Sequence, residues 1–196
     1  LQQAPPARVV FFLETGPLTT LAAALEIAPE IESKIGRILW MGGALDVPGN
    51  VRAHEDANID GTMEWNAYWD PEAAHAIWQT DIPVVMCSLD ITNNVPLTKD
   101  FMNMLAYQYP LKISDLAGQA YALVRHQPYY IWDVLTTSYL AWPEIFTVGE
   151  RKVEIVPAGA SQGRTLPSDK GKTVQTMLTV DVDALHANLA KAWERD

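Results

Sequence analysis

The sequence has few of the residues that build several common kinds of site. It contains one cysteine, Cys87, and four histidines among 196 residues, so no internal disulfide can form and no zinc-ligand spacing exists. It has no glycine-rich dinucleotide or phosphate loop, no G-x-S-x-G motif and no H-E-x-x-H motif. No stretch approaches the roughly 20 apolar residues that cross a membrane. These absences argue against a zinc enzyme, a P-loop or dinucleotide-binding protein, a G-x-S-x-G hydrolase and a membrane-spanning protein.

Net charge and hydrophobic content restrict the class further. The formal net charge is −10, and an acidic surface repels phosphate backbones, so no nucleic-acid partner is expected. Hydrophobic residues make up 48% and charged residues 19%, which is typical of a globular chain. The length suits one domain over residues 1–196, or part of one. Cys87 lies in the apolar run PVVMCSLD, which fits a buried thiol in a reducing compartment, and we therefore expect a cytoplasmic protein.

Apolar runs and helical patterns alternate along the chain. The predicted strands are 8–13, 37–45 and 82–90, followed later by 152–159 and 172–181, which we expect to be antiparallel neighbours. The predicted helices are 18–29, 70–80, a stretch over 99–126 interrupted near Pro110, a stretch over 133–142 and a closing helix over 183–196. This rhythm predicts an α/β fold with a mixed, mainly parallel sheet and helices on both faces.

Ligands of open α/β sheets bind beyond the carboxyl ends of the strands. Three groups of residues follow predicted strands directly: Thr15, residues 41–43 and residues 90–93. The sequence therefore predicts a binding site at this edge of the sheet.

One polar cluster with a possible role in binding is Glu64-Trp65-Asn66. In an extended stretch, the carboxylate and the carboxamide would point the same way and could bind several hydroxyls, as a sugar requires. Trp65 between them could form an apolar wall. The alternative is a loop before a helix, with its polar residues facing water.

Three further positions each have a structural alternative. Asn50 follows a glycine, which is common in turns. Asp133 could cap a helix or bind a hard metal ion, with Trp132 as a stacking surface for a flat heterocycle. The carbonyl of Thr15 could bind Ca²⁺ or only belong to a glycine turn.

Together, these segments resemble the inosine–uridine-preferring nucleoside hydrolase family. The resemblance rests on TGPLT at 15–19, MGGA at 41–44, GN at 49–50, EWNAYWDPEAA at 64–74, PVVMCSLDIT at 83–92, VPLT at 95–98 and WD at 132–133, in this order. It covers nearly the whole chain, and the motifs are specific because they occur together in register. It implies a mixed, mainly parallel α/β sheet and an enzyme that splits nucleosides into base and ribose.

The resemblance also implies roles for individual residues. The backbone oxygen of Thr15 and the carboxylate of Asp133 would be ligands of a Ca²⁺ ion that activates water. Asn66 and Asp133 would hold ribose hydroxyls. Asn50 and Glu64 would hold the 5′-hydroxyl.

The base side of the implied pocket resembles the purine-preferring, inosine–adenosine–guanosine branch. A tryptophan in the middle of EWN, Trp65, and a tryptophan directly before the metal aspartate, Trp132, carry this resemblance. Trp132 would stack on the purine and help it leave, Met41 would line the sugar pocket, and Trp132 and Asp133 would be the catalytic residues of this chain.

Two features depart from the family pattern. Thr20 stands where the family usually has asparagine, and we expect it to cap or tighten the helix start. The family also begins with a strand and an aspartate-rich DxDxxxDD-type loop, which this sequence lacks. We therefore expect the chain to lack the N-terminal strands, to be inactive alone and to work with an N-terminal segment that supplies the water-activating base and most of the calcium charge.

A non-catalytic nucleoside- or ribose-binding protein is the main alternative, because it would keep the sugar-binding residues without the attacking base. A purely structural fragment that binds nothing is a third reading. By resemblance alone, we expect the enzyme to form homo-oligomers and to act on a purine nucleoside.

Overall fold

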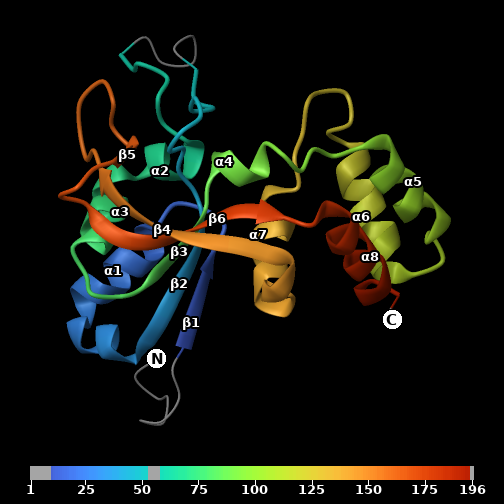
Figure 1. Cartoon of the computed structure of the whole chain (residues 1–196), viewed down its shortest axis with the longest axis horizontal. Helices are drawn as coiled ribbons and strands as arrows, with labels where there is room; N and C mark the ends of the chain where they lie inside the picture. Colours follow the sequence, from blue (N-terminus) through green and yellow to red (C-terminus); the bar gives the residue numbers. More distant parts are fainter. Residues whose placement is uncertain (1–9, 53–57, 195–196) are drawn as a thin grey trace. The chain divides into compact units, whose positions relative to one another are not determined.

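The computed structural model describes residues 10–52 and 58–194, and Figure 1 shows the order of their elements. The strands are β1 (Val10–Glu14), β2 (Ile35–Met41), β3 (Val84–Cys87), β4 (Phe146–Ile155), β5 (Thr165–Pro167) and β6 (Lys172–Val180). The helices are α1 (Thr19–Ile27), η1 (Pro29–Lys34), α2 (Trp65–Trp69), α3 (Pro71–Trp78), α4 (Leu89–Thr92), α5 (Lys99–Tyr107), α6 (Lys112–Ala122), α7 (Trp132–Ala141), η2 (Pro143–Ile145) and α8 (Val182–Ala192).

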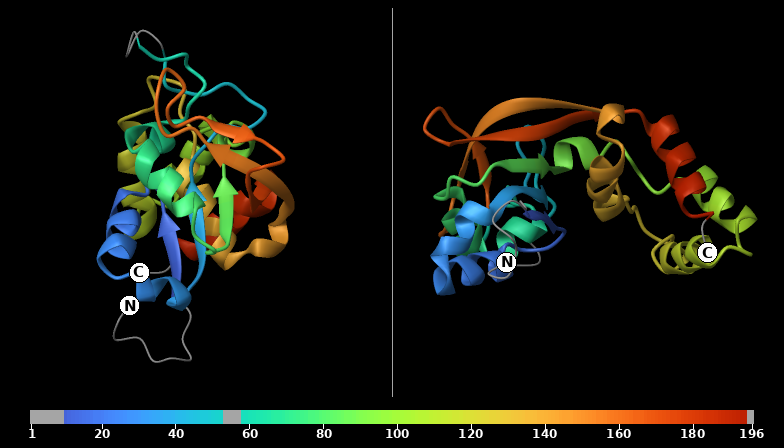
Figure 2. Two further views of the ribbon diagram at one scale, coloured as in Figure 1. Left: turned by 90° about the vertical axis from the view of Figure 1, so that its left-hand side faces the viewer. Right: turned by 90° about the horizontal axis from the view of Figure 1, so that it is seen from below.

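The six described strands form one sheet in the order β1-β2-β3-β6-β4-β5. The pairs β1–β2, β2–β3 and β3–β6 are parallel, and β4–β5 is antiparallel. The left view of Figure 2 shows β1, β2 and β3 side by side with their arrowheads at the same end. This confirms the predicted α/β fold with a mixed, mainly parallel sheet, and β4 and β6 are neighbours as expected.

The chain divides into two compact units: residues 1–91 with 148–178, and residues 92–147 with 179–196. The prediction of one domain stays a prediction. In the first unit, α1 and α3 pack on the sheet through an apolar core that is centred on Trp40. The indoles of Trp40 and Trp78 meet edge to face with centroids 5.5 Å apart. Burial of such large rings is a major source of stability in a core of this kind.

The second unit contains α5, α6, α7, η2 and α8. Phe101 on α5 is almost fully buried, and its ring contacts those of Tyr121, His186 and Trp193. Leu105 of α5 and Leu185 and Leu189 of α8 are also buried. Spacing of three to four residues places these side chains on one face of each helix, as the helical periodicity predicted.

Three local predictions need correction. Residues 65–69 form the helix α2, whereas an extended stretch was expected there. Thr20 does not cap α1, because the N-cap position is Leu18 and no side chain bonds there. Asp133 is not the cap of α7, since Ile131 occupies that position and Asp133 lies in the first turn. Among the described residues, no helix is long and apolar enough to cross a membrane.

Candidate active site

Glu64 is buried and holds the start of α2 in place. Its Oε2 accepts hydrogen bonds from the backbone N–H groups of Asn66 at 3.0 Å, Ala67 at 3.3 Å and Gly43 at 3.0 Å. A carboxylate at a helix N-cap satisfies orphan amides and favours the positive end of the helix. Glu64 therefore neither faces water nor points out from an extended stretch, and it joins α2 to the segment after β2.

Asn66 links the ends of two parallel strands. Its Nδ2 donates to the carbonyl oxygen of Met41 at 3.0 Å and to that of Thr15 at 3.3 Å, and it lies 3.3 Å from the Met41 Sδ. Thr15 follows β1 and Met41 ends β2, so both carbonyls lie at the carboxyl edge of the sheet. The structure thus brings three of the predicted site residues together where the sequence predicted a site.

Asn50 reaches the same group from the loop before α2. Its Oδ1 accepts from the backbone N–H of Trp65 at 3.0 Å, while its own N–H donates to the Met63 carbonyl. A Cβ at Gly49 would lie 2.1 Å from the Met63 carbonyl oxygen, so only glycine allows this close approach. Asn50 is therefore fixed to the start of α2, and Trp65 is held through its backbone.

The ring of Trp65 is half-buried and packs at the edge of a small apolar cluster formed by Val51, Ile59 and Met63. It also stacks on Trp69 with ring centroids 5.2 Å apart. Trp65 therefore packs against its own helix and the preceding loop, and its role as an apolar wall of a binding site stays a prediction.

Trp132 and Asp133 lie in the second unit, at the start of α7. The Trp132 ring contacts Tyr129 edge to face at 4.6 Å and Tyr130 at 5.5 Å. Its buried Nε1 has no hydrogen-bond partner within the described part of the chain. The predicted convergence of these two residues with Asn66 stays a prediction.

Asp133 is exposed by surface area, yet nearby protein atoms remove part of the water around its carboxyl group. This desolvation raises the carboxyl pKa above its usual range. Burial, with smaller contributions from Tyr129 and Asp133, raises the pKa of the neighbouring Tyr121 to about 12. Burial also raises the pKa of Glu14, the residue before Thr15, which sequence reasoning did not select.

The described residues do not make a calcium site by themselves. Residues 10–52 and 58–194 hold no group of three or more His, Cys, Asp or Glu side chains that could bind a metal ion. Ca²⁺ takes 6–8 oxygen ligands, and the first unit offers the Thr15 carbonyl, which already accepts from Asn66.

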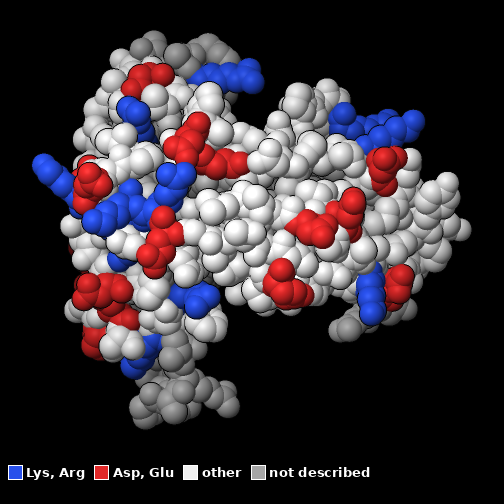
Figure 3. All heavy atoms as spheres, in the orientation of Figure 1, with Lys and Arg blue, Asp and Glu red and all other residues white. Residues whose placement is uncertain are grey.

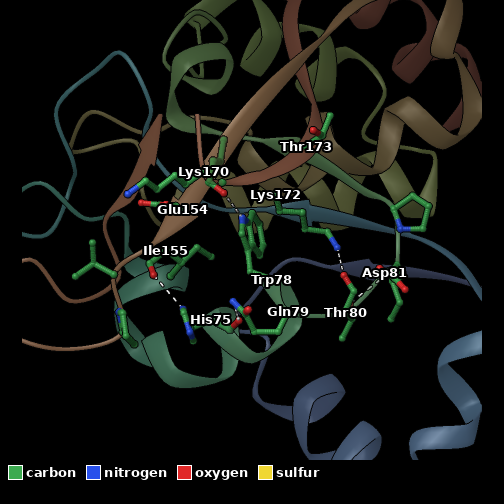
Figure 4. A pocket seen from close by; sticks show the side chains of 16 residues that line it. His75, Trp78, Gln79, Thr80, Asp81, Glu154, Ile155, Lys170, Lys172 and Thr173 are labelled. Carbon is green, nitrogen blue, oxygen red and sulfur yellow. Dashed lines mark hydrogen bonds between the residues drawn. The ribbon is translucent and has the colours of Figure 1, made fainter. Parts of the chain in front are cut away.

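A cavity of about 900 Å³ in the described residues contains none of the predicted site residues. Figure 4 shows it with His75 and Trp78 of α3 on one side and Lys170, Lys172 and Glu154 on the other. The Trp78 indole donates to the Val153 carbonyl at 2.9 Å, the His75 ring contacts the Ile155 carbonyl at 3.2 Å, and Lys172 donates to Thr80 at the end of α3. These bonds tie α3 and the residues just after it to β4 and β6.

The face in Figure 3 carries Lys and Arg interspersed with Asp and Glu, without one continuous patch of either sign. Arg151 and Asp46 form an exposed ion pair that is 2.7 Å long.

Residues 2–187 match the family model of the inosine-uridine preferring nucleoside hydrolases. The chain belongs to this family. A solved inosine-uridine preferring nucleoside hydrolase from Bacillus anthracis is 37% identical, with a TM-score of 0.92, and the match covers 100% of this chain and 63% of that one. A purine-preferring ribonucleoside hydrolase from Gardnerella vaginalis is 27% identical, with a TM-score of 0.75, over 95% and 62% of the two chains.

The pyrimidine-specific ribonucleoside hydrolase RihA of Escherichia coli O8 is 33% identical over 90% of this chain and 58% of its own length. This chain therefore spans less than two thirds of the relatives that it matches. The names of these nucleoside hydrolases differ in base preference, so the family is shown and the purine branch stays a prediction.

Proposed function

We propose that this chain is part of an enzyme that hydrolyses the N-glycosidic bond of purine ribonucleosides to free base and ribose. The observation that carries the proposal is the network around Asn66, in which the ends of β1 and β2 and the start of α2 meet. Its polar groups lie where ligands of parallel sheets bind, and the chain belongs to a nucleoside hydrolase family.

The sugar-binding roles follow from hydrogen-bonding capacity. The Asn66 carboxamide oxygen can accept from a ribose hydroxyl while its nitrogen stays bonded to the sheet. A carboxylate accepts hydrogen bonds from hydroxyl groups, and Glu64, whose carboxylate also caps α2, is assigned to the 5′-hydroxyl. Asn50, fixed to the start of α2, is assigned to the same hydroxyl, and Met41 to the wall of the sugar pocket.

The assignment of a purine rests on tryptophan. Trp132 sits in an aromatic group with Tyr129 and Tyr130, and a flat purine offers a larger stacking surface than a pyrimidine. Asp133, in the same helical turn, is assigned to the ribose hydroxyls and to a metal ion.

We propose Ca²⁺ as the cofactor, with Thr15 and Asp133 as two ligands and further oxygens from a segment outside this chain. When bound, the ion would lower the pKa of a water and hold ribose oxygens. Fewer ligands than calcium needs lie in the described residues, so this chain alone is expected to be inactive. Self-association of the whole enzyme is part of the same proposal.

The test is hydrolysis by the intact enzyme of inosine against uridine, with calcium or with a chelator. We expect inosine to be preferred, chelation to abolish turnover and added calcium to restore it. Trp132→Ala should lower turnover of inosine more than that of uridine, while Trp142→Ala, at the other end of α7, serves as the matched control. Equal rates on the two nucleosides would remove the purine assignment, and indifference to the chelator would remove calcium.

A non-catalytic nucleoside- or ribose-binding protein is the second candidate. Asn50 and Asn66 are side chains of the kind that bind sugar hydroxyls. The described residues contain no cluster of metal-binding side chains beside them, and this combination favours the second candidate. Calorimetric titration with ribose and inosine, run beside a turnover assay, separates the two. Binding without turnover in calcium supports the second candidate against the first.

A further inference from the structure

The segment after β2 is fixed by side chains from three distant parts of the chain. Residues 43–46 begin two positions after Met41, and each of their four successive backbone N–H groups donates to a side chain. Gly43 donates to Glu64 Oε2 at 3.0 Å, Ala44 to Thr165 Oγ1 at 2.8 Å, Leu45 to Asp90 Oδ2 at 2.9 Å and Asp46 to Asp90 Oδ1 at 2.7 Å. A loop usually leaves such groups to water, so this segment is held as firmly as a strand.

Asp90 supplies half of these bonds. Each of its two carboxylate oxygens accepts from one backbone amide, and Oδ2 also accepts from the Ser88 hydroxyl at 2.8 Å. Ser88 is almost fully buried and follows β3, so the carboxylate is oriented from the strand that neighbours β2. Hydrogen bonds to an ionised acceptor are stronger than bonds between neutral groups.

Backbone bonds fix the same segment to the end of β3. The Gly42 N–H donates to the Cys87 carbonyl at 3.2 Å, and the Leu89 N–H donates to the Gly43 carbonyl at 2.9 Å. Gly43 has φ +84°, and a Cβ there would lie 2.8 Å from the Met86 methyl group. Position 43 therefore requires glycine in the course that the segment takes.

The course of residues 43–46 sets two elements of the candidate site. Met41, two residues before the segment, carries the carbonyl that Asn66 binds. Gly43, its first residue, donates to the same Glu64 oxygen that caps α2. A shift of the segment would move both contacts.

We propose that Asp90 is a positioning residue for the sugar-binding side of the site. Its carboxylate holds residues 45 and 46, and through them it fixes the Met41 carbonyl and the Glu64 carboxylate at the geometry that Asn66 and ribose require. The effect on substrate rests on the proposed function, whereas the effect on Asn66 concerns the ligand-free chain.

The first test is made on this chain without ligand. Asp90→Asn keeps the shape but leaves one acceptor oxygen for two amides, so hydrogen exchange at Leu45 and Asp46 should accelerate by about tenfold or more. The Asn66 side-chain amide signal in a nitrogen–proton NMR spectrum should shift in the same variant. Arg151→Gln is the matched control, because it removes the ion pair to Asp46 and leaves the backbone amides bonded.

A second variant covers the case in which Asp90→Asn does not fold. Ser88→Ala removes one donor to the carboxylate and keeps Asp90 itself, so the same signals should change in the same direction by less. The proposal is wrong if a folded Asp90 or Ser88 variant has the same Asn66 amide signal and the same exchange rates at Leu45 and Asp46 as Arg151→Gln. This outcome does not depend on which substrate the enzyme hydrolyses.

The second test uses the intact enzyme and inosine. Asp90→Asn should raise KM by about tenfold and change kcat less, because it weakens the ribose-binding geometry in ground and transition states alike. An unchanged KM would overturn the positioning role. Absence of turnover in the unmodified enzyme would instead reject the proposed function, and the NMR measurement would then decide the role of Asp90 alone.

Discussion

At the scale of single residues, the site depends on where hydrogen-bond donors are placed. Asn66 donates to the carbonyls of Thr15 and Met41, which come from two strands and would otherwise present only acceptors to each other. No carboxylate can replace it, because an ionised carboxylate accepts and does not donate. Asn66 is thus both part of the candidate sugar site and a connection between α2 and the sheet.

Asn66→Asp should destabilise the first unit by about 1 to 2 kcal/mol and abolish detectable ribose binding, because it sets a carboxylate against two carbonyl oxygens. Urea unfolding and calorimetry measure the two effects. Asn103→Asp makes the same charge change at an exposed position on α5 and should leave both unchanged. Equal stability of the two variants would show that the Asn66 bonds contribute nothing.

At the scale of elements, Asp70 joins two helices. It caps α3 by accepting from the Ala73 N–H at 3.0 Å, and its other oxygen accepts from the Thr19 hydroxyl of α1 at 2.5 Å. The cap and Pro71 were predictable because they are local in sequence. The bond to Thr19 spans 51 residues and has no local pattern.

Asp70→Ala should lower the free energy of unfolding by about 1 kcal/mol, since α3 loses its side-chain cap. Thr19→Val removes only the bond between the helices and should cost less, because both groups are partly exposed to water. Thermal unfolding of the two variants and the unmodified chain makes the comparison. If Thr19→Val costs as much as Asp70→Ala, the cap is not the source of stability.

At the scale of the whole molecule, stability depends on groups that are kept neutral by packing. His186 on α8 lies against Phe101 with ring centroids 4.9 Å apart, and its buried Nε2 lacks a hydrogen-bond partner within residues 10–52 and 58–194. Burial lowers the pKa of His186, against a smaller opposing effect of Asp183. The folded chain therefore binds a proton at His186 less readily than the unfolded chain.

The lowered pKa of His186 in the folded chain predicts how the free energy of unfolding changes with pH. When the pH falls below about 6.5, the ordinary pKa of histidine, His186 becomes protonated in the unfolded chain but stays neutral in the folded chain. The free energy of unfolding therefore decreases with falling pH until the pH is below the pKa of His186 in the folded chain. His186→Gln should flatten this part of the stability curve, and His126→Gln, at an exposed position, is the matched control. Urea unfolding at a series of pH values measures it, and parallel curves for His186→Gln and the unmodified chain would contradict the prediction.

The sequence alone determined the features that depend on neighbours along the chain. Apolar runs and turn residues located β1, β2, β3 and the helices α3, α5, α6 and α8. These elements were predictable because the spacing of apolar side chains along the chain differs between strands and helices. Motifs in register indicated the family. Residues 65–69 were misjudged because capping by Glu64 fixes a short helix that periodicity over five residues cannot reveal.

Only the tertiary structure decided which of these residues meet. Thr165 bonds Ala44 from 121 positions away, and no spacing in the sequence selects it. The sequence located Asp90 at the end of a strand, but its bonds to the amides of residues 45 and 46 follow no sequence pattern. Single Thr and Asp residues are common at strand ends, and their partners are backbone amides that every residue possesses. The chain order thus gives the chemical groups of the site, and the packing of parallel strands decides the geometry in which they act.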